Sequence, residues 1–258
     1  ALSWIEIASL TALEIFSIHD NALTGPLFPE IGAWSSLRIF DANNNEMSGQ
    51  LPSQIGALEQ LSFMDVSSNS FSGALPEEVG DLDRLVTLNL GNNIFTSLPN
   101  SLGNLESLVS FNAPFNSLSG QLFNNWGNLQ SLQDIDLEGN SLSGNLPASI
   151  GELGELLELN LSNNLFSSNI PGSYGDLANL VVLRLNSNQL TGNVPISFGD
   201  LQFVTEVRLD DNDLTGAVPE EVCDSFEVLA PLFYLDCASG SELTCPPGLC
   251  CTYCCTDG

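Results

Sequence analysis

The stretch "SLQDIDLEGNSLSGNLPASIGEL", residues 131–153, decides the fold because its pattern recurs along nearly the whole chain. Its Asn140 belongs to a series of nine asparagines, in which seven of the eight spacings are 24 residues and one is 23. Self-similarity at such a period indicates a solenoid, in which each repeat stacks on its neighbours. The series is Asn21, Asn45, Asn69, Asn93, Asn116, Asn140, Asn164, Asn188 and Asn212.

Apolar residues keep fixed offsets from these asparagines. Leu132, Ile135 and Leu137 lie eight, five and three positions before Asn140, and the equivalent residues of every other copy are also apolar. Side chains alternate between the two faces of a strand, so residues 135 and 137 point into a core while residues 134, 136 and 138 point outward. No single repeat can bury its own apolar residues, so the copies are predicted to stack strand beside strand.

The copies read L-x-x-L-x-L-x-x-N-x-L-x-G-x-[IVL]-P-x-x-[IVLF]-G-x-L. This pattern resembles the plant-type leucine-rich repeat of receptor-kinase ectodomains and polygalacturonase-inhibiting proteins. The resemblance covers about residues 2–222 and implies a solenoid of the α/β class. Such a solenoid is a curved, right-handed stack with one parallel β-sheet on its concave face and short 3-10 or irregular segments on its convex face. Phe123 in the fifth copy and Ser168 in the seventh replace the usual proline and glycine, and the fourth copy is one residue short.

The two ends of the chain differ from the repeats. Plant-type repeats usually begin with a cap that contains paired cysteines, and residues 1–9 contain none. We therefore expect either a fragment or a chain whose N-terminal end is covered by another part of the molecule. The repeat is lost after residue 222, so the sequence predicts a solenoid over 1–222 and a cysteine-rich cap over 223–258.

All seven cysteines lie in this C-terminal segment. Their density favours a disulfide framework formed in an oxidising compartment, and the C-x-x-C spacing of two of them leaves zinc as the alternative. An odd number leaves at least one thiol that is free, pairs with another chain or lost its partner with a truncated end. The tail resembles those of secreted and surface-anchored leucine-rich repeat proteins of diatoms. The cysteines are Cys223, Cys237, Cys245, Cys250, Cys251, Cys254 and Cys255.

The composition is strongly acidic, with 32 aspartates and glutamates, four arginines and a formal net charge of −28. Nucleic acids and anionic membrane surfaces need basic patches, so the charge argues against both as partners. No apolar run approaches the roughly 18 residues of a membrane span. We expect a secreted or cell-surface protein.

The outward positions of the predicted sheet vary along the solenoid. Near the N-terminus, Ile15, Ile39 and Phe63 form one column beside Asp41 and Asp65. An exposed apolar strip with a polar rim is a candidate contact site for a partner. The alternative is a trio of scattered surface hydrophobic residues.

The middle of the same surface is acidic, with Asp134, Asp136, Glu138 and Glu158 close together. These side chains are either a solvated acidic patch or a weak calcium site formed by residues 134, 136 and 158. Apart from such a calcium ion, no cofactor is predicted.

The C-terminal part of the surface contains Arg184 and Arg208 on adjacent strands. They could bind a carboxylate or a sulfate, but neutralisation by Glu206, Asp210 and Asp211 is the favoured interpretation. The sequence Asn160-Leu161-Ser162 is the one glycosylation sequon, although a strand within a sheet is a poor acceptor.

Catalysis is disfavoured because His19 is the only histidine and the outward surface is open, so we expect that burial cannot raise a carboxyl pKa far. The leading hypothesis is an extracellular recognition or adhesion module that binds a protein, peptide or polysaccharide on the strand face. The alternative is a structural subunit of a cell wall or larger extracellular assembly. Ice binding is a third hypothesis, which the charges at Asp41, Asp65, Asp136, Arg184 and Arg208 weaken.

Overall fold

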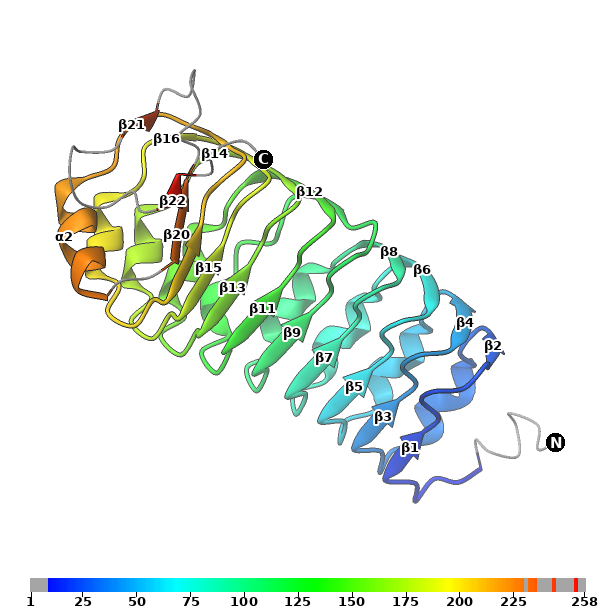
Figure 1. Ribbon diagram of the computed structural model, residues 1–258. Coiled ribbons are helices and arrows are strands. Elements are labelled where there is room, and N and C mark those ends of the chain that lie inside the picture. Colours follow the sequence, from blue (N-terminus) through cyan, green and yellow to red (C-terminus); the bar gives the residue numbers. More distant parts are fainter. Residues whose placement is uncertain (1–8, 230–231, 236–242, 245–252, 255–258) are drawn as a thin grey trace. The chain divides into compact units, whose positions relative to one another are not determined.

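The computed structural model describes residues 9–229, 232–235, 243–244 and 253–254. The chain forms two compact units, Ala1–Ser119 (unit 1) and Gly120–Gly258 (unit 2), and each is a stack of repeats (Figure 1). A typical repeat contributes one strand to a main parallel sheet, a second short strand and a 3-10 helix. The main-sheet strand and the 3-10 helix are the elements that the sequence analysis predicts, whereas the second strand was not predicted.

The main sheet of unit 1 consists of parallel strands that follow one another in sequence order. Equivalent positions of neighbouring repeats lie opposite one another, so Ile15 pairs with Ile39 and Ile39 pairs with Phe63. The strands are β1 (Ile15–Ser17), β3 (Ile39–Asp41), β5 (Phe63–Asp65), β7 (Thr87–Asn89) and β9 (Ser110–Asn112).

The main sheet of unit 2 follows the same rule and continues beyond the last repeat. Its last two strands come from the C-terminal segment and pair parallel with β17 and with each other. The strands are β11 (Asp134–Asp136), β13 (Glu158–Asn160), β15 (Val182–Arg184), β17 (Glu206–Arg208), β20 (Leu232–Leu235) and β22 (Tyr253–Cys254).

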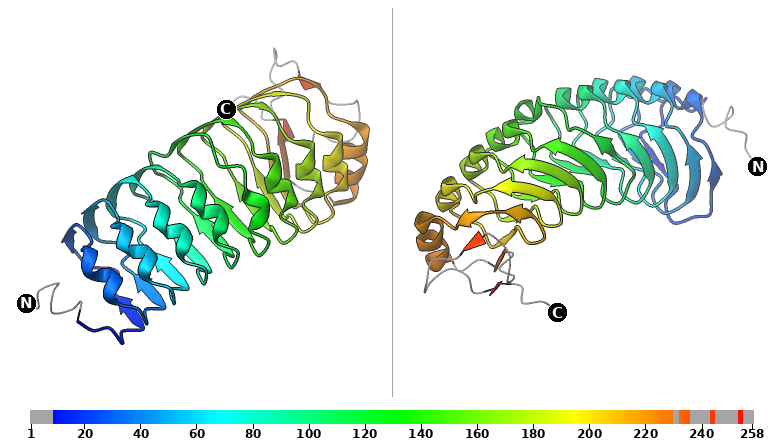
Figure 2. Two further views of the ribbon diagram at one scale, coloured as in Figure 1. Left: turned by 180° about the vertical axis from the view of Figure 1, so that it is seen from behind. Right: turned by 90° about the horizontal axis from the view of Figure 1, so that it is seen from above.

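Within each unit, the 3-10 helices lie on the side opposite the main sheet (Figure 2). A proline in extended conformation immediately precedes most of them, and it fixes the entry of the chain into the turn. The helices are η1 (Pro29–Ala33), η2 (Ser53–Ala57), η3 (Glu77–Asp81) and η4 (Asn100–Asn104) in unit 1, and η5 (Trp126–Asn128), η6 (Ala148–Glu152), η7 (Gly172–Asp176) and η8 (Ile196–Asp200) in unit 2.

Second strands form smaller parallel sheets at the side of each unit. Those of unit 1 are β2 (Thr24–Gly25), β4 (Glu46–Gly49), β6 (Ser70–Ala74) and β8 (Ile94–Ser97), and β10 (Ser119–Gly120) lies at the boundary of the units. Those of unit 2 are β12 (Ser141–Asn145), β14 (Leu165–Asn169), β16 (Gln189–Gly192) and β18 (Asp213–Leu214), followed by a separate pair, β19 (Gly216–Ala217) and β21 (Leu243–Thr244).

The core of each unit is built from the three predicted apolar columns. Leu132, Ile135 and Leu137 have no exposed side-chain area, and the prediction that they form the scaffold is confirmed. Burial of each such side chain contributes on the order of 1.5–3 kcal/mol relative to exposure. The columns therefore hold the repeats together over their whole length.

The recurring asparagines bridge neighbouring repeats through their side chains. Asn164 Nδ2 donates to the carbonyl of Leu137 in the preceding repeat (2.9 Å) and to Leu161 and Ser162 in its own repeat (3.3 and 3.1 Å). Its Oδ1 accepts a hydrogen bond from the amide of Leu142, again in the preceding repeat (3.0 Å). One buried carboxamide thus satisfies backbone groups that the turn leaves without partners.

The residue before each recurring asparagine adopts the left-handed conformation, which the sequence pattern did not reveal. Apart from Gly139, these residues are not glycine, and their φ angles lie between 51° and 59°. Phe115 is the unusual member, since a bulky side chain is disfavoured there. Ser168, which replaces a glycine of the pattern, also keeps a positive φ of 69°. The other residues are Asp20, Asn44, Ser68, Asn92, Asn163, Ser187 and Asp211.

Helix α2 (Glu220–Leu229) packs against η8 at the end of unit 2, and the expected boundary at residue 222 falls inside it. Val222 and Phe226 are buried, and the Phe226 ring meets Phe233 edge-on at 5.1 Å between centroids. Cys223 is 2% exposed and disulfide-bonded. The pairing of Cys237, Cys245, Cys250, Cys251, Cys254 and Cys255 concerns side chains outside the described residues.

We expect Asn164→Ala to lower the free energy of unfolding by about 2–4 kcal/mol, because it leaves several buried backbone groups without hydrogen bonds. Urea unfolding monitored by circular dichroism measures this loss. Asn145→Ala is the matched control, because Asn145 is exposed, and we expect its effect to stay within about 0.5 kcal/mol. Equal losses in the two variants would contradict the bridging role of the recurring asparagines.

Candidate functional site

The outward surface of the main sheet in unit 1 contains the first group of predicted contact residues. Ile15 is 57% exposed, and Ile39 and Phe63 are half-buried. The strand register places the three side chains side by side, and we call them the apolar column. Thr87 and Ser110 continue the same positions, so the apolar column ends at β5.

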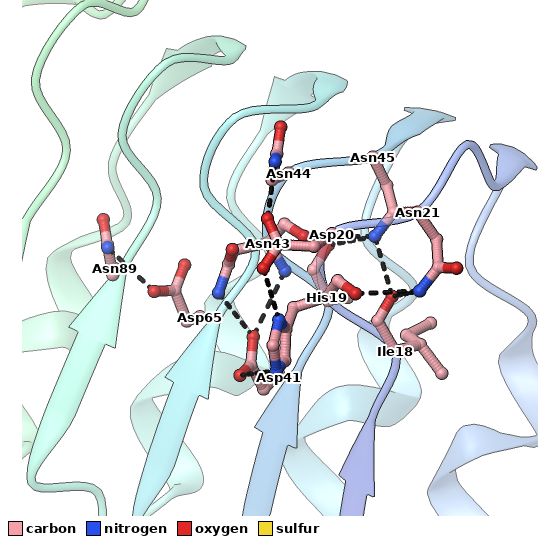
Figure 3. Close-up of polar contacts among 11 residues, drawn as sticks. Ile18, His19, Asp20, Asn21, Asp41, Asn43, Asn44, Asn45, Asp65 and Asn89 are labelled. Carbon is pink, nitrogen blue, oxygen red and sulfur yellow. Dashed lines mark hydrogen bonds and ion pairs between the residues drawn. The ribbon is translucent and has the colours of Figure 1, made fainter.

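Asp41 and Asp65 stand next to the apolar column and face neighbouring amide groups (Figure 3). Asp41 Oδ1 accepts a hydrogen bond from Asn43 Nδ2 (2.7 Å). Asp65 Oδ1 accepts from the amide of Ser67 (2.8 Å), and its Oδ2 accepts from Asn89 Nδ2 (3.0 Å). Neither aspartate makes an ion pair with an arginine in the part of the chain that the structure describes. We call these two residues the acidic pair.

His19 is the basic neighbour of the acidic pair, at the edge of the same surface (Figure 3). Its Nδ1–H donates to Asp20 Oδ2 (2.8 Å), and its Nε2 lies 4.0 Å from Asp41 Oδ2. The hydrogen bond to Asp20 and the charge of Asp41 raise the pKa of His19 above its ordinary value. Hydrogen bonds from Asn44 and His19 lower the pKa of Asp20.

The predicted acidic patch of unit 2 is less open than expected. Burial raises the pKa of Asp136, although the Glu138 amide donates to its Oδ1 (3.0 Å) and partly opposes this shift. Burial and the adjacent Glu158 charge raise the pKa of Asp134 as well. Burial therefore raises both pKa values although the outward surface is open, because neighbouring side chains cover part of each group.

The calcium hypothesis receives no support from the geometry. No group of three or more acidic, histidine or cysteine side chains within the described residues is arranged to hold a metal ion, and this includes Asp134, Asp136 and Glu158. Glu158 Oε1 accepts a hydrogen bond from Arg184 Nη1 (2.6 Å). Glu138 is also engaged, because its carboxylate accepts hydrogen bonds from Asn160 Nδ2 (3.0 Å) and Asn163 Nδ2 (3.2 Å).

The two arginines of the surface are neutralised within unit 2. Arg184 forms a bidentate pair with Glu206, with both nitrogen–oxygen distances at 2.9 Å, in addition to its bond to Glu158. Arg208 pairs with Asp210 at 3.2 and 2.9 Å. Neutralisation by Glu206 and Asp210 is confirmed, and the contact with Glu158 was not foreseen. Asp211 makes no ion pair with either arginine among the described residues.

Tyr234 adds a contact that the repeat pattern could not predict. The Arg208 guanidinium lies over its ring at 5.0 Å from the centroid. Tyr234 belongs to β20, outside the repeats, and β20 pairs with β17. Strand β20 therefore contributes to holding Arg208 against the sheet.

The candidate glycosylation site at Asn160 is buried, with 4% of the residue exposed. Its Nδ2 donates to Glu138 Oε2 (3.0 Å), and its Oδ1 accepts from Ser162 Oγ (2.7 Å). A glycan on Nδ2 would displace the contact with Glu138 and could not be accommodated in the folded surface. The sequon is therefore unfavourable as an acceptor site.

We expect folded protein secreted from a eukaryotic host to keep its mass after treatment with an amidase that removes N-linked glycans. The buried Asn160 amide is the physical reason. Intact-mass spectrometry makes the comparison, and an Asn160→Gln variant supplies the glycan-free reference. A mass decrease that is confined to the parent protein would show that the sequon is used.

We expect Glu206→Gln to destabilise the protein by about 1–2 kcal/mol at pH 7. The hydrogen bond from Arg184 lowers the pKa of Glu206 in the folded state. Its contribution is therefore present above the unfolded pKa of about 4.3 and is lost as the pH falls through the lower folded value. Unfolding free energies measured between pH 3 and pH 7 should converge at the acidic end.

Asp136→Asn serves as the comparison, because the pKa of Asp136 is shifted in the direction opposite to that of Glu206. Because the folded pKa of Asp136 is raised, its ionised form is penalised in the folded state, and the neutral amide should not destabilise the protein at pH 7. A loss in Glu206→Gln that is the same at pH 3 and pH 7 would show that charge is not the cause.

The comparisons with known proteins agree with this architecture. The family model described as Leucine Rich Repeat matches residues 84–105, 131–153, 155–177 and 179–201. No curated protein matches the chain. Within the described residues, none of the helices reaches the length and apolarity needed to span a bilayer.

Solved structures of plant receptor ectodomains are similar to the chain. The ectodomain of the Arabidopsis receptor kinase HAESA, in complex with an N-terminally extended IDA peptide hormone ligand, is 31% identical, with a TM-score of 0.82 over 95% of this chain and 40% of that chain. The ectodomain of the Arabidopsis thaliana receptor kinase GASSHO1/SCHENGEN3, in complex with CASPARIAN STRIP INTEGRITY FACTOR 2, is 26% identical, with a TM-score of 0.80 over 93% of this chain and 31% of that chain. The chain thus spans less than half of either receptor chain.

A plant ice-binding protein has the same fold, with 24% identity and a TM-score of 0.63 over 90% of this chain and 80% of that chain. This likeness concerns the fold alone. The repeated sequence, the stacked parallel sheets with their 3-10 turns and the similar structures lead to one conclusion. The chain carries leucine-rich repeats of the plant type and folds as a leucine-rich repeat solenoid.

Proposed function

We propose that the chain is an extracellular recognition module that binds a peptide, or a peptide segment of a protein, on the outward surface of unit 1. The receptor ectodomains that it resembles support a recognition role, since the HAESA structure contains a peptide hormone ligand. Leucine-rich repeat ectodomains typically serve as binding modules rather than as enzymes. An extracellular location also agrees with the acidic composition and the C-terminal cysteines.

The observation that carries the proposal is the contrast between the two units. In unit 2, the arginines already occupy Glu158, Glu206 and Asp210 as partners. In unit 1, the acidic pair has amide and histidine neighbours but no arginine partner within the described residues. The surface of unit 1 therefore retains negative charge that a ligand can neutralise.

The shape of this surface suggests the chemistry of the ligand. The apolar column offers exposed side-chain area, and the acidic pair lies two residues further along β3 and β5, on the same face of the sheet. A peptide with a basic side chain next to an aliphatic or aromatic one would contact both groups at once. A bound ammonium or guanidinium would form charge-assisted hydrogen bonds with the carboxylates.

A randomised peptide library displayed on phage tests this proposal. We expect selection on the parent protein to enrich peptides that combine arginine or lysine with a large apolar residue. Phe63→Asp and Asp65→Asn should each weaken binding of the enriched peptides by about fivefold or more, as measured by surface plasmon resonance.

Glu106→Gln is the matched control, because it removes the same charge as Asp65→Asn from an exposed site that follows η4. Its affinity should equal that of the parent. Enriched peptides that bind Phe63→Asp and Asp65→Asn as tightly as the parent would place recognition elsewhere on the molecule. Failure to enrich any peptide would favour the structural-subunit alternative.

A further inference from the structure

An open pocket of about 430 Å³ lies on unit 2, where the second strands end and the chain turns toward the 3-10 helices. It spans three consecutive repeats and contains none of the outward residues of the main sheet. Asn169, Asn193 and Ala217 occupy the same position of these repeats and line one side of the pocket. Pro195 and Ile196 belong to the other part of its lining.

Local sequence explains why the hollow exists. The carboxamide of Asn169 lies against Gly192, where a Cβ atom would come within 2.5 Å of Asn169 Oδ1, and Asn193 lies against Gly216 in the same way. Glycine at these two positions lets each amide lie flat along the side of the stack. The third repeat has Ala217 in place of an asparagine, so the row of amides stops there and leaves space.

Among the described residues that line the pocket none is charged, which is notable in a chain with a net charge of −28. Neither Asn169 nor Asn193 has a side-chain hydrogen-bonding partner among the described residues. Each amide offers one acceptor oxygen and two donor hydrogens. Ile196, which is 59% exposed, and the rings of Pro195 and Pro219 provide apolar area beside them.

We propose that this pocket, the amide pocket, binds a neutral linear oligosaccharide. Sugar hydroxyl groups both donate and accept hydrogen bonds, as the two amides do, and the C–H face of a sugar ring packs on apolar side chains. Neighbouring strands are about 4.8 Å apart, so successive amides repeat at a distance close to the length of one sugar unit. The volume lies within the range of about 300–1,000 Å³ that ligand pockets occupy.

The charge of the protein and of the pocket restricts which polymers could bind at this surface. An anionic polysaccharide would be repelled by the acidic protein and would find no cation among the described lining residues. A basic ligand would find no carboxylate there either. A neutral chain of hexoses is the class that matches amides, apolar side chains and the lack of charge.

Titration of the whole protein with cellohexaose and with maltohexaose, monitored by isothermal calorimetry and amide chemical shifts, tests the proposal. We expect at least one of them to bind and to shift the signals of Asn169, Asn193 and Ile196. Asn193→Ala should weaken binding about fivefold to tenfold through lost hydrogen bonds. Ala217→Trp should fill the pocket and abolish binding.

Asn145→Ala is the matched control, because Asn145 occupies the equivalent position of an earlier repeat and does not line the pocket. It should bind as the parent does, as should Phe63→Asp, whose change lies on the surface proposed for peptides. Circular dichroism establishes that each variant is folded before titration.

Three results would overturn the proposal. They are no binding of either hexasaccharide at millimolar concentration, unchanged binding by both Asn193→Ala and Ala217→Trp, and equal binding of a hexa-uronate of the same length. Loss of sugar binding in Phe63→Asp would place the sugar on unit 1 and would also exclude the amide pocket. None of these results tests peptide binding by unit 1, which has its own experiment.

Discussion

The hydrogen bonds of one recurring carboxamide determine how the rest of the structure is built. Every repeat must turn from its main strand back into the core, and this turn leaves backbone donors and acceptors away from water. The asparagine side chain satisfies them in its own repeat and in the preceding one. Once these groups are paired, the apolar columns stack in register, and the positions between them become free to vary.

The free positions show two different uses of charge. In unit 2, arginine and carboxylate side chains pair across three adjacent strands, from Glu158 through Arg184 to Glu206. Such partly buried pairs stabilise the surface on which they lie and have little capacity left for a ligand. In unit 1, the aspartates of the acidic pair interact with amides and with His19, and neither has an arginine partner within the described residues. The same scaffold therefore supports one surface whose charged side chains are paired with one another and another surface that can accept a cationic partner.

The 24-residue period predicts the strands, the core and the register of the outward residues, because all three depend on the repeat alone. The alignment of Ile15, Ile39 and Phe63, and that of Asp134 with Glu158, follow directly from it. The repeat does not predict the burial of Asn160 and Asp136, because this burial depends on the conformation of long neighbouring side chains such as Glu138. The contact of Arg208 with Tyr234 was hidden because Tyr234 lies outside the repeat. The amide pocket depends on a single alanine that interrupts a row of asparagines, a change too small to stand out in the sequence.

The left-handed residue before each recurring asparagine has a consequence for how such chains change over time. Aspartate, asparagine, serine, glycine and even phenylalanine occupy this position, although their intrinsic preferences for the conformation differ widely. The neighbouring repeats impose the geometry. The free-energy cost of an unfavourable residue is therefore offset by the packing of several repeats rather than by the repeat that contains it alone. A single repeat with a poor residue can therefore persist where it is stacked between two other repeats. Mutational tolerance at this position should accordingly depend on the packing of the neighbouring repeats rather than on the residue itself.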